Sequence, residues 1–378
     1  MSAHAEVLVD LDAIKHNVAT LQEKAGVPLL AVVKADAYGH GLVAVGRVAI
    51  EAGAHWLGVA LLEEAVLLRT AGIKAPIIAW LVPPGSAFLT AVKSDIDIGV
   101  PSIQVYHDVA LAAGHAGKKA RIHIEVDTGM TRGGFLEEWG AFLEILKEPH
   151  GHVEIIGLFS HFARADEPGE KQNAAQLKRF LEMADDLNQI GIEPSVLHLS
   201  NSAATLMDAS AHFDLVRTGI AMYGLSPDLQ HLGNSKHLDL RPAMTLRAKL
   251  QLVKEVLANT PVGYGATAFT PDDTKLGVVA MGYADGIPRI AQGAGIYVDG
   301  KRAPIIGRVS MDQFVVDLGS DSLAKAGDWV VVFGPGYDGE YTADDWASAS
   351  HSINYEIVTR INPRVSRIYV NSDGNGVV

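Results

Sequence analysis

The segment LLAVVKADAYGHG, residues 29–41, places a lysine directly after an apolar run. Lys34 follows five apolar residues and is followed by Asp36, Tyr38 and two glycines. A lysine amine held in a pocket at the end of a buried strand can react with an aldehyde. A lysine at an ordinary strand end instead extends its ammonium group into solvent. The segment alone leaves both interpretations open.

Other polar side chains with catalytic or binding potential lie at, near or just after the ends of apolar runs. They are Arg132 in VDTGMTRGG, His161 in GLFSHF, the pair Asn201–Ser202 in HLSNSAATL and Arg217 in LVRTGI. Each has a purely structural explanation, since a buried histidine makes hydrogen bonds, an arginine pairs with a carboxylate and a serine caps a helix. Their repeated position at the ends of apolar runs favours a shared site.

Eight short apolar runs, separated by helical stretches rich in alanine and leucine, must position these residues. They cover residues 29–35, 55–60, 76–82, 95–100, 120–127, 153–162, 195–201 and 213–220. Eight strand–helix units are the number that closes a (β/α)8 barrel, and a doubly wound open sheet is the alternative. We favour the barrel, whose sites lie at the carboxyl ends of its strands.

Strand alternation adds two carboxylates to this rim. In RIHIEVD, Ile122, Ile124 and Val126 share one face and are expected to meet helices. Glu125 and Asp127 are then expected to face the barrel lumen, where they could also serve as structural partners of the arginines.

Ser202 and the backbone amides of TGIA, residues 218–221, are candidates for a phosphate site. The loops after strands seven and eight commonly bind phosphate in such barrels. A phosphate site opposite a pocket lysine implies a phosphorylated cofactor that carries an aldehyde. Pyridoxal phosphate, held as a Schiff base on Lys34, is the natural candidate, and an arginine can contact its pyridine nitrogen.

The pattern changes after about residue 240. AMTLRAKLQLV alternates with period two, IYVDGKRAPI has the Asp-Gly turn of a hairpin, and TADDWASAS opens with the capping box Thr342–Asp345. We therefore predict a (β/α)8 barrel over residues 1–239 and a mostly antiparallel β domain over residues 240–378.

Composition excludes several functions. The net charge is −13 with no basic cluster, which argues against a nucleic-acid groove. There is no cysteine, so disulfides, thiolate zinc sites and a catalytic thiol are absent. The motifs HExxH, Gly-x-Ser-x-Gly and the Walker loop are also absent. With no secretory signal and no membrane-length apolar run, we expect a soluble, cytoplasmic protein.

The chain resembles the alanine racemase family of fold-type III pyridoxal phosphate enzymes. The resemblance extends from VDLDAIKHN to RVSRIY, and AVVKADAYGHG resembles the cofactor-lysine motif of the family. Further segments are similar to family motifs in the family's order, namely VDTGMTRGG, SHFARAD, HLSNSAATL, VRTGIAMYGL, VGYGAT, GYADG, GRVSMDQ and INYE.

The resemblance implies roles for individual residues. Lys34 would bind the cofactor and take the proton from D-alanine, and Tyr264 would take it from L-alanine. Around the cofactor, the matching residues are Tyr38, His161, Ser202, Arg217, Gly219, Ile220 and Tyr355. Arg132, Met311 and Asp312 match residues near the substrate, and Asp166, Tyr283, Arg289 and Arg308 match an access corridor. No metal is implied.

The resemblance also implies a head-to-tail homodimer, because Tyr264 and Met311 reach the site from the other subunit in this family. The implied product is D-alanine, for bacterial peptidoglycan. Three alternatives stay open: a racemase of broader specificity or for serine, a non-catalytic pyridoxal phosphate carrier, and a decarboxylase on a related scaffold. The carrier is disfavoured by the β domain, and the decarboxylase by the missing cysteine.

The chain departs from the family at Glu125, where many members have a lysine that becomes carbamylated. We hypothesise that Glu125 supplies the anion that orients Arg132, seven positions later. Chloride near Arg132 is another possibility.

Overall fold

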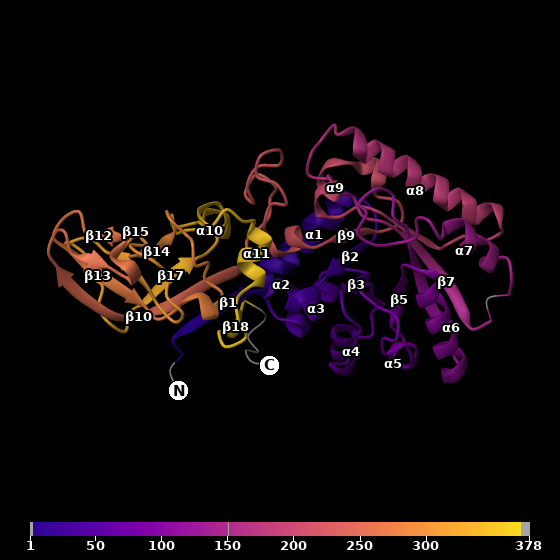
Figure 1. The fold of residues 1–378 in the computed structure, drawn as a ribbon, viewed down its shortest axis with the longest axis horizontal. Helices are drawn as coiled ribbons and strands as arrows, with labels where there is room; N and C mark the ends of the chain where they lie inside the picture. The colour runs from indigo at the N-terminus through magenta and orange to yellow at the C-terminus, as the bar shows by residue number, and fades with distance from the viewer. Residues whose placement is uncertain (1–2, 150, 372–378) are drawn as a thin grey trace. The chain divides into compact units, whose positions relative to one another are not determined.

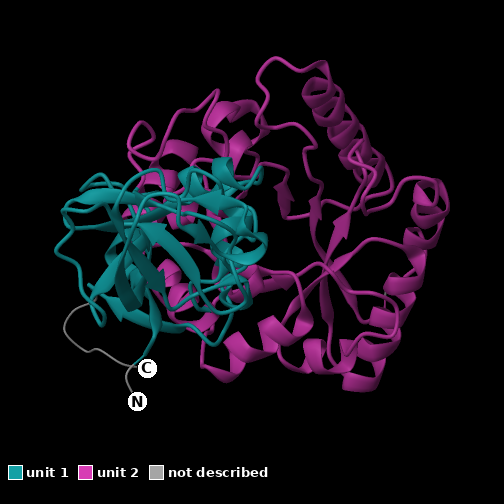
Figure 2. Ribbon diagram, turned by 60° about the vertical axis from the view of Figure 1, so that its left-hand side comes forward, with its two compact units in different colours: residues 1–13, 38–41, 241–378 teal, residues 14–37, 42–240 magenta. Residues whose placement is uncertain are grey.

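The computed structural model describes residues 3–149 and 151–371, which form two compact units (Figure 2). Unit 1 comprises residues 1–13, 38–41 and 241–378, and unit 2 comprises residues 14–37 and 42–240. None of the helices in the described ranges is long and apolar enough to cross a membrane.

Unit 2 is built around eight parallel strands, several of which are labelled in Figure 1. They are β2 (Leu29–Val32), β3 (Trp56–Val59), β4 (Ile77–Ala79), β5 (Asp97–Val100), β6 (Ala120–Glu125), β7 (Val153–Phe159), β8 (Val196–His198) and β9 (Val216–Thr218). The ladder has the order β8-β7-β6-β5-β4-β3-β2-β9. Its two ends are joined by hydrogen bonds from the Asp214 and Arg217 amides to the Leu197 and Ser200 carbonyls, at 3.2 and 2.9 Å. Each strand lies within one predicted run. The predicted barrel is therefore confirmed, as a nearly closed one, and the alternative of an open sheet is wrong.

Helices connect these strands and surround them. They are α1 (Leu11–Ala25), α2 (Lys34–Tyr38), α3 (Leu42–Glu51), α4 (Leu62–Thr70), α5 (Phe88–Lys93), α6 (Ile103–Ala116), α7 (Trp139–Leu146), α8 (Lys171–Gln189) and α9 (Ser202–Met207), with 3-10 turns η1 (Ala209–Ala211) and η2 (Ile220–Tyr223). Local signals set their ends: the Ser102 hydroxyl accepts from the Val105 amide at the start of α6, and Gly117 ends it with φ 61°.

The side chains of the barrel strands are closely packed. Ile122, Ile124 and Val126 are buried, as the alternation of β6 predicts. Gly157 on β7 leaves room for a neighbour, because a Cβ there would lie 2.1 Å from Nδ1 of His123. The barrel is therefore a packed core with its chemistry restricted to the rim.

Unit 1 is a mostly antiparallel sheet with two short helices. Its strands are β1 (Ala5–Asp10), β10 (Met244–Val256), β11 (Pro261–Val262), β12 (Ala268–Phe269), β13 (Thr274–Val279), β14 (Gly295–Val298), β15 (Lys301–Pro304), β16 (Phe314–Asp317), β17 (Trp329–Phe333) and β18 (Ser366–Val370). The 3-10 turns are η3 (Tyr264–Ala266) and η4 (Tyr283–Asp285), and the helices are α10 (Ala343–Ala349) and α11 (Asn354–Thr359).

Two local predictions in unit 1 are confirmed. The Asp-Gly turn joins β14 to β15, with φ 52° at Asp299 and 75° at Gly300, as a type I′ hairpin requires. The capping box starts α10: the Asp345 amide donates to the Thr342 hydroxyl at 3.1 Å, and the Thr342 amide donates to the Asp345 carboxylate at 2.9 Å.

The N-terminal strand belongs to the sheet of unit 1. β1 pairs with β10 in antiparallel fashion and with β18 in parallel, so residues from both ends of the chain meet in one sheet. The division into a domain of residues 1–239 and a domain of residues 240–378 stays a prediction.

Candidate active site

Lys34 follows β2 at the rim of the barrel and opens a left-handed turn. Ala35, Asp36 and Ala37 have φ of 53–54° and ψ of 45–53°, and Tyr38 continues with φ 53°. Left-handed conformation costs about 1–2 kcal/mol per residue without glycine. Backbone strain of this kind is concentrated at functional sites, and here it begins at the residue after the lysine.

Two carboxylates stabilise the turn. Glu64 accepts hydrogen bonds from the amides of Ala35, Ala60 and Leu61, at 2.6, 3.0 and 3.1 Å. Asp36 accepts from the Leu42 amide at 2.8 Å, where α3 begins. These bonds hold the backbone that directly follows Lys34, so the direction of its side chain is constrained.

The electrostatic environment favours a neutral Lys34 amine. Burial lowers the pKa of Lys34, and the charges of Arg132 and Arg217 lower it further, against an opposing effect of Glu64. Within the described residues, the Lys34 amine has no hydrogen bond or ion pair to a protein group. A lowered pKa makes a lysine amine a more readily available nucleophile and base.

Glu125 lies near the two arginines. Burial raises the pKa of Glu125 to about 7, although Arg132 and Arg217 act in the opposite direction. The loop that carries Arg132 packs on this carboxylate, because a Cβ at Gly133 would lie 3.4 Å from Glu125 Oε1. The geometry is consistent with Glu125 as a partner of Arg132.

Asp127 binds backbone amides of the loop that leads to Arg132. Its Oδ1 accepts hydrogen bonds from the amides of Gly129, Met130 and Thr131, at 2.8, 3.1 and 3.1 Å. It therefore holds the loop that leads to Arg132.

Arg217 is buried and almost fully hydrogen-bonded. Nη1 donates to the His198 carbonyl at 2.6 Å and lies 3.4 Å from His198 Nδ1. Nη2 donates to the carbonyls of Ser160 and Leu199 at 2.7 and 3.1 Å and lies 3.2 Å from His161 Nδ1. In the described part of the chain, the Nε–H is the one group of this guanidinium with no hydrogen-bond partner.

The pKa values of this group agree with a positive arginine beside a neutral histidine. Burial lowers the pKa of Arg217 to about 10, which leaves it charged at neutral pH. Burial lowers the pKa of His161 to about 3, and Arg217, Arg132 and Lys34 contribute. His161 is therefore neutral, with Nδ1 as a hydrogen-bond acceptor for Arg217.

Ser202 lies beside the turn that follows β9. The helix cap is Asn201, whose Oδ1 accepts from the Ala204 amide at 3.1 Å, so the structural explanation of Ser202 as the N-cap is wrong. Ser202 Oγ instead accepts from the amides of Gly219 and Ala221, at 2.9 and 3.4 Å, on both sides of Ile220. Because both contacts use the oxygen as acceptor, the hydroxyl hydrogen remains for another ligand.

In unit 1, Tyr38 and Tyr355 lie together. Their ring centroids are 6.3 Å apart, and burial raises the pKa of Tyr38 to about 12. The segment that follows Tyr38 packs closely, because the Arg367 Nε–H donates to the Gly39 carbonyl at 3.0 Å. A Cβ at Gly39 would lie 2.4 Å from the Val358 carbonyl oxygen. The glycine at position 39 is thus explained by close backbone contact.

Tyr264 and Met311 lie on exposed loops of unit 1. Tyr264 is 70% exposed and Met311 54%. Arg308 lies beside the Tyr264 turn, since its Nη1 is 3.4 Å from where a Cβ at Gly265 would be.

The remaining predicted residues lie on exposed segments. Asp166 is in unit 2, and Tyr283, Arg289 and Asp312 are in unit 1. The Tyr283 amide donates to the Ser310 carbonyl at 3.0 Å, which joins η4 to the segment that carries Met311 and Asp312. Their role in an access corridor stays a prediction.

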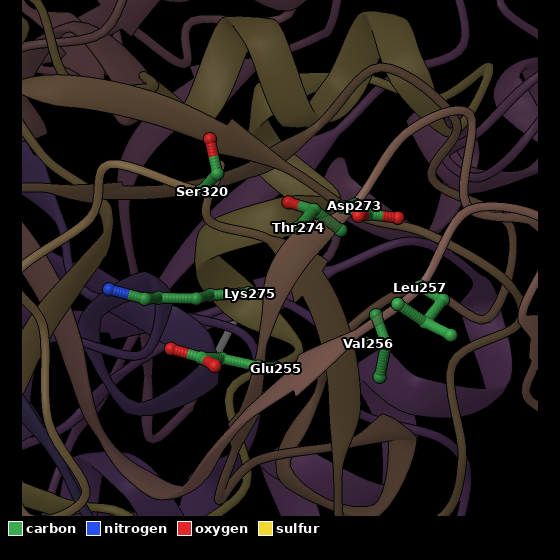
Figure 3. A pocket seen from close by; sticks show the side chains of 7 residues that line it. All are labelled: Glu255, Val256, Leu257, Asp273, Thr274, Lys275 and Ser320. Carbon is green, nitrogen blue, oxygen red and sulfur yellow. The ribbon is translucent and has the colours of Figure 1, made fainter.

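Unit 1 also has two cavities away from these residues. One, of about 310 Å³, is lined by Glu255, Val256, Leu257, Asp273, Thr274, Lys275 and Ser320 (Figure 3). The other, of about 600 Å³, is lined by residues that include Asp10, Arg241 and Tyr337. No residue predicted for the site lines either cavity.

Sequence reasoning missed two groups next to the site. Glu64 has no local signal, because its bond to Ala35 joins separate strand–helix units. The sequence did contain a signal for His123 and His198. Each lies on a barrel strand, and His123 is two residues before Glu125 on the same face of its strand.

A barrel with arginines around a lysine at its rim, followed in the chain by a β unit, defines a class of two-unit enzymes whose site is centred on the lysine, here Lys34. Residues 9–227 match the alanine racemase N-terminal domain, and residues 243–369 match the C-terminal domain. The chain belongs to the alanine racemase family.

Individual relatives agree over nearly the whole chain. The alanine racemase of Streptomyces coelicolor is 49% identical over 383 residues, which span 98% of this chain and 96% of the relative. The crystal structure of alanine racemase from D-cycloserine-producing Streptomyces lavendulae has a TM-score of 0.96 at 47% identity and covers 98% of both chains. That of Bacillus anthracis, with bound L-Ala-P, has a TM-score of 0.88 at 38% identity and covers 100% of this chain and 97% of its own.

Proposed function

We propose that this protein interconverts L-alanine and D-alanine, with pyridoxal phosphate bound through Lys34. The observation that carries the proposal is the cluster at the barrel rim: a lysine amine held toward its neutral form, two arginines and one remaining Nε–H on Arg217. Membership of the alanine racemase family supports it. The relative with bound L-Ala-P supports alanine as the substrate.

The residues fit pyridoxal phosphate at three points. The Lys34 amine suits the aldehyde, and the Ser202 hydroxyl with the backbone around Gly219 suits the phosphate. The Nε–H of Arg217 suits the pyridine nitrogen, which accepts one hydrogen bond. The cofactor, when bound, supplies the electron sink that makes the Cα–H of an amino acid acidic.

The protein's own groups then exchange the proton. Lys34, whose pKa is lowered by burial and by arginine charge, removes or returns the proton on one face of Cα. Tyr264 does so on the opposite face, from a turn that lies beside Arg308. Arg132, oriented by Glu125, holds the reacting groups in position. Two bases on opposite faces are what inversion of Cα requires.

Arg217 limits the chemistry that can follow. Its guanidinium stays charged at neutral pH, so its Nε–H would donate to the pyridine nitrogen of the cofactor and could not accept a hydrogen bond from a protonated ring nitrogen. A ring nitrogen held unprotonated is a weaker electron sink than a protonated one. This favours proton exchange over slower side reactions such as transamination.

The site is completed by a second copy of the chain in this proposal. Tyr264 and Met311 are exposed in the single chain, as expected if each enters the site of a partner in a head-to-tail homodimer. We further propose that the enzyme acts in the cytoplasm and supplies D-alanine for peptidoglycan.

Solvent exchange is the sharpest test. The two enantiomers have equal free energy, so kcat/KM in both directions must stay equal in every variant. In D2O, the native protein should racemise alanine and label Cα of both enantiomers. Tyr264→Phe should lose racemisation, yet still label D-alanine through Lys34 and leave L-alanine unlabelled.

Lys34→Ala is the second variant. Borohydride reduction of the native protein with pyridoxal phosphate should give a stable adduct whose peptide contains Lys34, and Lys34→Ala should give none. Absence of racemisation in the native protein, or equal labelling of both enantiomers by Tyr264→Phe, would contradict the proposal. Parallel assays with L-serine establish the substrate range.

A further inference from the structure

A chain of buried polar side chains crosses the barrel lumen beneath Arg217. Its members are Asp97 on β5, His123 on β6, His198 on β8 and Arg217 on β9. His123 Nδ1 lies 2.9 Å from His198 Nε2, and His198 Nδ1 lies 3.4 Å from Arg217 Nη1. At the other end, His123 Nε2 lies 3.5 Å from Asp97 Oδ2. All four side chains are at most 6% exposed.

The two charged ends determine which nitrogens carry hydrogen. Arg217 can only donate, so it favours a lone pair on His198 Nδ1 and hydrogen on His198 Nε2. That hydrogen is then donated to His123 Nδ1, which leaves the His123 hydrogen on Nε2, toward the Asp97 carboxylate. The opposite arrangement would direct an N–H of His198 at the guanidinium and a lone pair of His123 at the carboxylate. Arg217 and Asp97 both disfavour that arrangement.

The imidazoles are neutral in this arrangement. Burial lowers the pKa of His123 and of His198, and the charge of Arg217 adds to both effects. His123 Nε2 makes no hydrogen bond within the described residues, so the electrostatic attraction of Asp97 decides its protonation.

Neighbouring side chains hold the geometry. Arg121 binds both carboxylate oxygens of Asp97, at 2.7 and 3.1 Å, which fixes the orientation of that carboxylate. The ring of Phe159 stacks on His198 with centroids 5.0 Å apart, and the ring of Trp56 meets His123 edge to face at 5.2 Å. The rings therefore have little freedom to rotate and reverse the direction of the hydrogen bonds.

We propose that Asp97 and His123 are positioning residues that act on Arg217 through His198: they keep a lone pair on His198 Nδ1 toward Nη1. The consequence is that the terminal nitrogens of Arg217 stay bound to the barrel and Nε–H is the donor presented at the rim. The inference rests on the proposed function for the use of that donor. The direction of the hydrogen bonds depends on no ligand.

The first measurement uses the native enzyme loaded with pyridoxal phosphate and labelled with 15N-histidine. Two-bond proton–nitrogen correlations should show His123 and His198 neutral, with hydrogen on Nε2, at both pH 6 and pH 8. Hydrogen on Nδ1 of His198, or a charged imidazole at either residue, overturns the proposal. No variant has to fold for this result.

The second measurement uses Asp97→Asn, which retains the shape of the side chain and removes its charge. Its amide can donate to His123 Nε2, so both histidines should shift toward hydrogen on Nδ1. Affinity for pyridoxal phosphate, measured by absorbance titration, should fall by about tenfold, as after loss of outer-shell partners at metal sites. Asp97→Glu should restore part of it.

Asp95→Asn is the matched control. Asp95 is two residues away, and its exposed carboxylate pairs with Lys118, so neither the histidine signals nor the affinity should change. If Asp97→Asn has the native circular dichroism spectrum, unchanged histidine signals and unchanged affinity, the proposal fails. A native protein with the expected histidine signals but no racemisation contradicts the proposed function alone.

Discussion

Glu125→Gln should make the stability of the protein depend differently on pH. In the folded chain, burial raises the pKa of Glu125 from 4.5 to about 7. The charged carboxylate is therefore less favourable in the folded than in the unfolded state. The penalty is absent below pH 4.5, grows as pH rises from 4.5 to 7, and is complete above pH 7. Glutamine has the same shape and no such penalty.

The size of the effect follows from the two pKa values. A difference of one unit corresponds to roughly 1.4 kcal/mol, so the full penalty is about 3 kcal/mol. At pH 5 only about 1 kcal/mol of it is present. The free energy of unfolding of Glu125→Gln, relative to the native chain, should thus increase by about 2.5 kcal/mol between pH 5 and pH 8.

Urea unfolding at the two pH values, without added cofactor and at one protein concentration, measures this difference. Glu255→Gln, on an exposed strand position, controls for the substitution itself. The reasoning is refuted if the stability difference between Glu125→Gln and the native chain is the same at both pH values, or is smaller at pH 8. In that case the charges of Arg132 and Arg217, and not burial, would determine the pKa of the Glu125 carboxylate.

Three further substitutions test separate parts of the structure. Gly39→Ala should lower the thermal stability of the protein more than Gly191→Ala. The two glycines have φ of 79° and 78°, but only at Gly39 would the new Cβ lie 2.4 Å from a backbone oxygen. Equal losses of stability in the two variants would contradict the close contact. Thr342→Ala should lower the free energy of unfolding by about 1 kcal/mol through loss of the α10 cap, whereas Thr342→Ser should retain most of it. Ser202→Ala should weaken binding of pyridoxal phosphate by about tenfold, which is the effect of losing one hydrogen bond to a charged group. Binding of pyridoxal, which has no phosphate, should be unchanged. A similar loss for both ligands would show that Ser202 does not contact phosphate.

Much of the fold was predictable because its signals are local. Each barrel strand is a short apolar run between helical stretches, and burial of both faces in a parallel sheet requires that composition. The hairpin depends on Asp299 and Gly300 alone, and the start of α10 depends on Thr342 and Asp345. In each case the interacting residues are neighbours in sequence.

The candidate site was predictable in part. Lys34, Arg132, His161 and Arg217 were found because they follow strands, and a barrel brings all strand ends to one rim. Tyr264 had no such signal: it lies in a turn flanked by glycines, and its proposed role came only from resemblance.

The sequence by itself determined the barrel, the type of the second unit and the polar residues at the rim, because periodicity and turn chemistry act between residues close along the chain. Only the tertiary structure decided the pairing of β1 with β10 and β18, the left-handed turn after Lys34 and the choice of Asn201 as cap. It also decided which N–H of Arg217 remains for a ligand. These features depend on groups from distant strands that share one buried space, where each donor and acceptor must be matched.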